Sequence, residues 1–247
     1  MNKIVLYVAG FLSFASQSGA AIIYSTSFEN PPFHLGQAAG QDGWVNFGSP
    51  ANVVIENTLA HTGSQALQIS ATGAVGQTGV QHPESFDTSA NPNKIVLVTV
   101  DMLRQSGGTL SGVEDLAGFD GAGTDLGVIR WSSNDSLVIV SGSGTITVPS
   151  ALTKNTWNTF GLAFDFSTRT FSASLNGSLV ASGLPFSGAS SSPVWTGASL
   201  TIQVPGTDNV FFDNYSSSSV SSVPEPISLS LCALGLLTLA LYRRKLL

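Results

Sequence analysis

Carboxylate side chains offer the simplest route to bond-breaking chemistry in this chain of 247 residues. Hydrolysis of a glycosidic bond, for example, uses two carboxyl groups that face each other across a cleft, about 5 to 9.5 Å apart. Glu114 and Asp115 are consecutive, so a strand would point them to opposite faces. An acid pair would have to be assembled from separate strands, for instance from Asp101 and Asp165, and this is the enzymatic alternative.

Other catalytic arrangements are not supported by the sequence. The three histidines are far apart and lack the spacing of a zinc site: His34, His61 and His82. The sequence has no Gly-x-Ser-x-Gly motif between a strand and a helix. The single cysteine, Cys232, excludes an internal disulfide and a cysteine-based zinc site. Asp120 and Asp125 flank a glycine-containing segment and are expected to be turn residues. We therefore predict no catalytic residue.

Exposed aromatic side chains could bind sugars, because the apolar face of a sugar stacks on an indole ring. Trp44, Trp131 and Trp195 lie near expected loops or a strand end, and they are the candidate ligand-binding residues. Trp157 begins an apolar strand and is assigned to packing. For each of the three candidates the alternative is burial, since large aromatic side chains are mostly part of a core.

The composition indicates a β protein with an acidic surface. Only 10% of the residues are charged, 43% are hydrophobic and 26 are glycine, a balance unlike that of a helical protein. Between residues 22 and 223, five cationic and fourteen acidic side chains leave a net charge of −9. Nucleic acid is excluded as a partner, because its binding needs a basic surface. Neutral glycans or divalent cations fit such a surface better.

Alternation of apolar and polar residues dominates the middle of the chain, as expected for half-buried strands. It is clearest in residues 95–102 and 160–166. Asn176-Gly177 predicts a two-residue type I′ hairpin between strands 170–175 and 178–182. Further strands are expected at 22–28, 66–70, 126–131, 136–141, 199–204 and 210–215. About a dozen short strands in ~195 residues predict an all-β fold, an antiparallel two-sheet β-sandwich or jelly roll.

Two acids could hold a structural metal ion in such a fold. Glu29 closes the first expected strand, and Asp213 lies among aromatic residues in the last one. A buried carboxylate must find hydrogen bonds or a cation, because burying it alone is unfavourable. If the first and last strands lie side by side, Glu29, Asp213 and backbone carbonyls could hold a calcium ion. The alternative is that Asp213 and Asn214 simply end the strand in a turn.

The N-terminus has the pattern of a secretory signal peptide. Lys3 precedes an apolar run over residues 4–15, and small residues follow as far as Ala21. We expect residues 1–21 to be a signal helix and the β-sandwich domain to cover 22–215. A serine-rich linker is expected over 216–223.

The C-terminus has a second apolar segment with a distinctive order. Pro224, Glu225 and Pro226 precede apolar residues 227–242, and the basic residues follow, Arg243 and Arg244 first. These sixteen apolar residues would form a helix of about 24 Å, somewhat short of the ~30 Å hydrocarbon core. The basic cluster favours a cytoplasmic C-terminus, with everything before Pro224 outside the inner membrane.

Residues 224–247 resemble the PEP-CTERM sorting segment of Gram-negative bacteria. The resemblance implies an exosortase-type membrane protease as partner, transient anchoring in the inner membrane by a transmembrane helix, and release to the cell surface or extracellular matrix. It also implies an association with exopolysaccharide. The alternative is a plain single-pass tail anchor.

The middle of the chain is similar to the concanavalin A-like lectin/glucanase (laminin-G-like) superfamily. The similarity lies in residues 62–69, 157–165 and 210–214, together with the turn around Asn176. Hydrolases of that superfamily carry a Glu-x-Asp-x-Glu or Glu-x-Asp-x-x-Glu run, which this sequence lacks. We therefore expect an exported, non-catalytic, lectin-like protein that binds glycan or exopolysaccharide. The alternatives are a polysaccharide hydrolase or lyase with a non-standard acid pair, and a purely structural surface protein.

Overall fold

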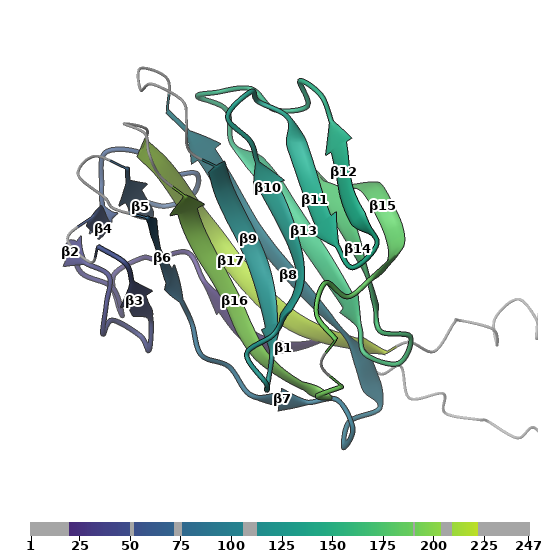
Figure 1. Cartoon of the computed structure of the whole chain (residues 1–247). Coiled ribbons are helices and arrows are strands. Elements are labelled where there is room, and N and C mark those ends of the chain that lie inside the picture. The colour runs from purple at the N-terminus through teal and green to yellow at the C-terminus, as the bar shows by residue number, and fades with distance from the viewer. Residues whose placement is uncertain are drawn as a thin grey trace, which may run out of the picture.

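The computed structural model describes residues 20–49, 52–71, 76–105, 113–189, 191–203 and 209–221. All regular structure in this part of the chain is β-strand, arranged as two antiparallel sheets that pack face to face (Figure 1). The predicted all-β, two-sheet sandwich is confirmed.

The first sheet, which we call sheet A, contains nine strands. Eight follow the order β15-β14-β13-β8-β17-β5-β4-β2, and β1 pairs with β17 beside this path. Their bounds are Ser178–Pro185 (β15), Thr170–Leu175 (β14), Asn158–Asp165 (β13), Asn93–Arg104 (β8), Asn209–Ser221 (β17), Ala66–Ser70 (β5), Val53–Glu56 (β4), Gly36–Gln37 (β2) and Ala21–Thr26 (β1).

The second sheet, sheet B, contains eight strands. Seven follow the order β12-β11-β10-β9-β16-β6-β3, and β7 pairs with β16. Their bounds are Gly144–Val148 (β12), Leu137–Ser141 (β11), Asp125–Trp131 (β10), Val113–Asp120 (β9), Val194–Gln203 (β16), Gln77–Gln81 (β6), Val45–Phe47 (β3) and Phe86–Asp87 (β7).

The core lies between the two sheets and follows the alternation that the sequence predicted. On β8, Val96, Val98, Val100 and Met102 are buried in the hydrophobic cluster, whereas Asp101 between the last two is not part of it. Because successive side chains on a strand point to opposite faces, Asp101 lies on the outer face of sheet A. Because the apolar side chains fill the space between the sheets, polar side chains that could contact a ligand lie on the two outer faces.

The hairpin predicted at Asn176-Gly177 joins β14 to β15. Both residues have positive φ, 51° and 75°, and Leu175 pairs directly with Ser178. These values are those that a two-residue hairpin turn requires. The meander of β13, β14 and β15 at the end of sheet A is confirmed.

The prediction of a linker over residues 216–223 is wrong for residues 216–221. Residues 216–221 extend β17 and pair with β8, and 216–219 also pair with β1. Ser217 and Ser219 are fully buried, and Asn93 donates a hydrogen bond to the hydroxyl of Ser219. Serine is small enough to lie inside the sandwich. Pairing with two neighbouring strands provides hydrogen-bond partners for the backbone N–H and C=O groups of this segment. A serine run that resembles a linker in sequence is therefore a central strand.

Both sorting signals fall outside the described residues. Residues 1–19 of the predicted signal segment 1–21 are not described, and neither are residues 222–247, which include Pro224, Glu225, Pro226, Arg243 and Arg244. Within the described part of the chain, no helix has the length and apolar character needed to cross a membrane.

Candidate functional site

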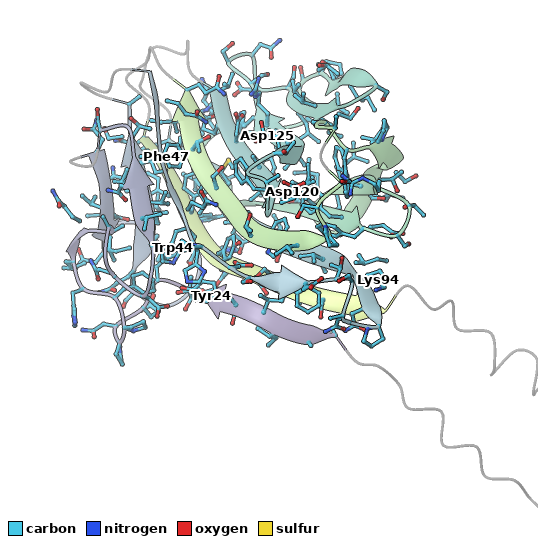
Figure 2. All side chains as sticks on the ribbon, turned by 60° about the horizontal axis from the view of Figure 1, so that its bottom comes forward. Tyr24, Trp44, Phe47, Lys94, Asp120 and Asp125 are labelled. Carbon is cyan, nitrogen blue, oxygen red and sulfur yellow. The ribbon has the colours of Figure 1, made fainter. Side chains whose placement is uncertain are left out.

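The three tryptophans predicted to bind ligand are buried. Trp44 is 1% exposed, and Trp131 and Trp195 are 0% exposed. Each indole N–H donates inside the protein: Trp44 to the Tyr24 hydroxyl at 3.0 Å, Trp131 to Asp135 at 3.0 Å, and Trp195 to Glu84 at 2.6 Å. Tyr24 and Trp44 lie together in Figure 2. The prediction of sugar-binding platforms at these positions is wrong, because the sandwich core takes up these large rings.

Glu29 and Asp213 meet at one loop, the 57–65 connection between β4 and β5. Glu29 accepts hydrogen bonds from the backbone N–H groups of Ser64 and Gln65, each at 2.7 Å. Asp213 accepts from the N–H groups of His61 and Thr62 at 3.0 and 2.9 Å. Both acids bind the same loop. A buried carboxylate needs either hydrogen-bond donors or a cation, and here backbone N–H groups are the donors. Among the residues described, no group of three or more metal-ligating side chains is placed to hold a metal ion.

The pKa values of these two acids shift in opposite directions. Burial opposes ionisation of Glu29, but the donors of Ser64 and Gln65 together lower its pKa below 4.5. For Asp213, burial outweighs the backbone donors and raises its pKa above 3.8. Glu29 is therefore the acid whose charge is stabilised by folding.

Asp101 and Asp165 do not form a catalytic pair. Asp165 pairs with Ile95, which is six residues from Asp101 along β8. At a rise of 3.3 Å per residue, about 20 Å separates the two positions, well beyond the ~9.5 Å limit for glycoside hydrolysis. Asp120 and Asp125 lie at the two ends of the β9–β10 turn, as predicted, and Asp120 accepts hydrogen bonds from two backbone N–H groups of that turn.

A groove of about 440 Å³ crosses the outer face of sheet B. Its volume lies within the ~300–1,000 Å³ of small-ligand sites. Its lining comes from five neighbouring strands: Phe47, Gln77, Gln81, Asp115, Ala117, Phe119, Asp125, Val128, Arg130, Ser199 and Gln203. Figure 2 shows Phe47 and Asp125 on opposite sides of β16, so the groove runs across the strands.

An ordered polar network lies within this groove. Asp115 on β9 is only 3% exposed, and it pairs across the ladder with Arg130 on β10. Arg130 donates from Nε to Oδ1 at 2.6 Å and from Nη2 to Oδ2 at 2.8 Å. Gln203 on β16 donates to Oδ2 at 3.0 Å. This bidentate arrangement holds the guanidinium plane in one orientation, because both partners are planar.

The groove carboxylates have raised pKa values. Burial raises the pKa of Asp115 above 3.8, although Arg130 and Gln203 oppose the shift. Desolvation also raises the pKa of Asp125. The hydrogen bond with Asp115 raises the pKa of Arg130 in turn. Both oxygens of Asp115 accept hydrogen bonds, so this carboxylate fixes the position of Arg130 in the groove.

Two half-buried phenylalanines, Phe47 and Phe119, complete the groove with the amide side chains of Gln77 and Gln81. Apolar rings beside a few fixed polar groups are typical of small-molecule sites. None of these groove residues was predicted, because the tryptophans were the aromatic residues expected to bind a sugar. Residues 113–120 have no clear alternation of apolar and polar residues, and no strand was predicted there. In the structure β9 places Asp115 and Phe119 on one face, and the pairing of β9 with β16 and of β3 with β6 brings distant segments together.

No protein-family model and no curated protein matches this chain. Solved structures share its fold. A cellulose induced protein, Cip1, is 20% identical, with a TM-score of 0.54 over 78% of this chain and 96% of that chain. A protein of unknown function with a galectin-like fold from Bacillus subtilis is 13% identical, with a TM-score of 0.51 over 81% of this chain and 97% of its own. A sialidase is 11% identical, with a TM-score of 0.52, and the match covers 73% of this chain but only 17% of that enzyme. The chain therefore has a galectin-like β-sandwich fold.

Proposed function

We propose that this protein binds a neutral glycan in the groove on sheet B and does not cleave it. The observation that carries the proposal is the hydrogen-bonded Asp115–Arg130–Gln203 network, which lines the same groove as the rings of Phe47 and Phe119. Sugar hydroxyls need donors and acceptors at fixed positions, and the apolar face of a pyranose packs on an aromatic ring. The groove supplies both kinds of group.

The charge of the groove favours a neutral ligand. Asp115 and Asp125 are acidic and Arg130 is the cationic side chain among the lining residues, which leaves a net charge of −1 when all three are ionised. A sulfated or uronic-acid polymer would meet repulsion from Asp125 and from the acidic remainder of residues 22–223. A neutral oligosaccharide would not.

The names of similar structures support a carbohydrate ligand. One neighbour is a sialidase and another is a cellulose induced protein. The bidentate pair of Asp115 with Arg130 supports a non-catalytic role. A glycoside hydrolase needs two carboxyl groups that are free to act on the glycosidic bond.

The test is binding to a panel of neutral oligosaccharides, followed by calorimetry with the best ligand. Phe119→Ala and Gln203→Ala should each weaken binding about tenfold, which corresponds to about 1.4 kcal/mol. Leu179→Ala is the control, because Leu179 is 67% exposed on sheet A, away from the groove. Unchanged affinity in both groove variants would refute the assignment. Release of reducing sugar that is lost in Asp125→Asn would instead identify a hydrolase.

We also propose that the protein is exported through the inner membrane and processed by an exosortase-type protease. This proposal rests on the order of residues 1–21 and 224–247 alone. Cell fractionation and intact mass of the native protein test it: the expected product lacks both apolar segments and is found outside the inner membrane. Full-length protein in the cytosol would contradict the proposal.

A further inference from the structure

The outer face of sheet A carries a pair of aromatic rings that does not line the groove on sheet B. Trp157, just before β13, is half-buried, in contrast to the three fully buried tryptophans. Its ring stacks with that of His61, with centroids 5.2 Å apart and planes inclined by 22°. The His61 side chain is 40% exposed. The sequence predicts a packing role for Trp157, but of the four tryptophans it is the one that is partly exposed to solvent.

Asp101 holds the imidazole of this pair in a fixed orientation. His61 Nδ1 lies 2.7 Å from Oδ2 of Asp101, and Thr159 and Asn214 donate to the same carboxylate at 2.5 and 2.8 Å. Because an ionised carboxylate only accepts hydrogen bonds, Nδ1 carries the proton in this pair. The Nε2 atom of a neutral His61 is therefore an acceptor.

Asn214 connects this pair to an open cleft of about 390 Å³. The cleft is lined by Ser25, Thr26, Ser27, Asn214, Tyr215 and Ser216. It lies where β17 departs from regular pairing with β8 between Asp213 and Ser216, and Asn214 there has a φ of 50°. Strained residues and bulges of this kind often aim a side chain at a functional site.

We propose that the cleft and the adjoining His61–Trp157 pair form a second carbohydrate-binding site, on the sheet opposite to the groove. The cleft presents hydroxyl groups, an amide and backbone, and none of its lining residues has an acidic carboxyl group or a basic side chain. The adjoining pair adds a half-buried indole stacked on a partly exposed imidazole. The nearest acids in the network, Asp101 and Asp213, already accept several hydrogen bonds each, which leaves a cation little to bind. A neutral, hydroxyl-rich ligand fits these groups best.

Two sites on opposite faces would make the domain bivalent. The proposed ligand class rests on the proposed function, but the site is made of different residues and can be tested separately. A bivalent domain would bridge two polysaccharide segments, and linked sites raise the apparent affinity for a polymer well above that of either site alone.

The test is an NMR titration of the 15N-labelled protein with the six-sugar oligomers of cellulose, laminarin and mannan. We expect at least one oligomer to shift the amide signals of Ser25 and Ser216 and the indole N–H signal of Trp157, which Trp157→Phe identifies. Ser25→Trp, a change at an exposed residue, should fill the cleft and abolish these shifts while the groove signals of Arg130 and Gln203 still respond.

The outcomes separate the two sites. Shifts confined to the groove would overturn the second site and leave the proposed function intact. Shifts confined to the cleft would support this inference and refute the groove. If no oligomer shifts the Ser25, Ser216 and Trp157 signals, the second site is wrong.

Discussion

Glu114 and Asp115 are consecutive on β9, and their carboxylates serve opposite sides of sheet B. Glu114 is buried in the sandwich and pairs with Arg104, which is also fully buried and lies over the ring of Trp131. Asp115 points outward and holds Arg130 in the groove. One acid therefore stabilises the fold and its neighbour shapes the candidate binding site.

Glu114→Gln should destabilise the protein by up to about 3–5 kcal/mol, because it removes the charge of the buried carboxylate that pairs with the fully buried Arg104 guanidinium, although Asp135, 3.5 Å from Arg104 Nη1, still offers a negative charge. Urea unfolding followed by fluorescence measures this loss. Asp115→Asn is the matched control at the next position. It should destabilise the protein less, since Arg130 is partly exposed and water can solvate it, but it should abolish groove binding. Equal destabilisation by the two changes would contradict this division of roles.

Binding in the groove should weaken as the pH falls. Protonation of Asp115 removes the charge that positions Arg130, and its raised pKa places this loss at a higher pH than for an ordinary aspartate near 3.8. Calorimetry between pH 7 and pH 4 measures the effect, with urea unfolding at each pH to confirm that the protein stays folded. Affinity that is constant down to pH 4 would show that Asp115 does not contribute through its charge.

Glu29 should make the stability of the protein depend on pH in acid. Its pKa is lower in the folded protein than the ordinary 4.5, so its contribution is present above about pH 4.5 and is lost as the pH falls through the lowered folded value. Glu29→Gln should remove this part of the pH dependence and loosen the 61–65 loop. Unfolding free energies at pH 6 and pH 3 for both proteins provide the comparison, and parallel curves would argue against the clamp.

Calcium and chelator should leave the melting temperature unchanged. Backbone N–H groups occupy Glu29 and Asp213, and a cation would have to displace these donors. Melting in the presence of calcium chloride or EDTA tests this directly. A rise of several degrees with calcium would revive the metal site, because a ligand that binds only the folded state stabilises it.

Replacement of Gly177 or Gly118 by alanine should destabilise the protein, for a different reason at each position. Gly177 has a φ of 75° and no atom within 4 Å of an added Cβ, so Gly177→Ala should cost about 1 kcal/mol through backbone strain alone. An added Cβ at Gly118 would lie 2.5 Å from Phe164 and 2.8 Å from Trp195. Gly118→Ala should therefore cost up to about 3 kcal/mol by overpacking the core. Thermal melts that rank the two in reverse would contradict this reading of the packing.

Local patterns predicted much of the fold. The alternation around Val98 and the Asn176-Gly177 turn each depend on residues close together in the chain, and both are found as expected. The same local logic failed for residues 216–221, because whether a polar strand is covered depends on β1 and β8, which are distant in sequence.

The sequence by itself determined the fold class, the acidic charge and the strands with a strong period of 2, since these properties are sums or short-range patterns. Only the tertiary structure decided that Trp44, Trp131 and Trp195 are core residues, that Asp115 meets Arg130 and Gln203, and that His61 meets Asp101 and Trp157. These contacts join strands and loops up to about a hundred residues apart. Their choice depends on which sheet each strand enters and which residues pair across it. The period of a single strand fixes which of its faces is buried, but it does not identify the partner strand.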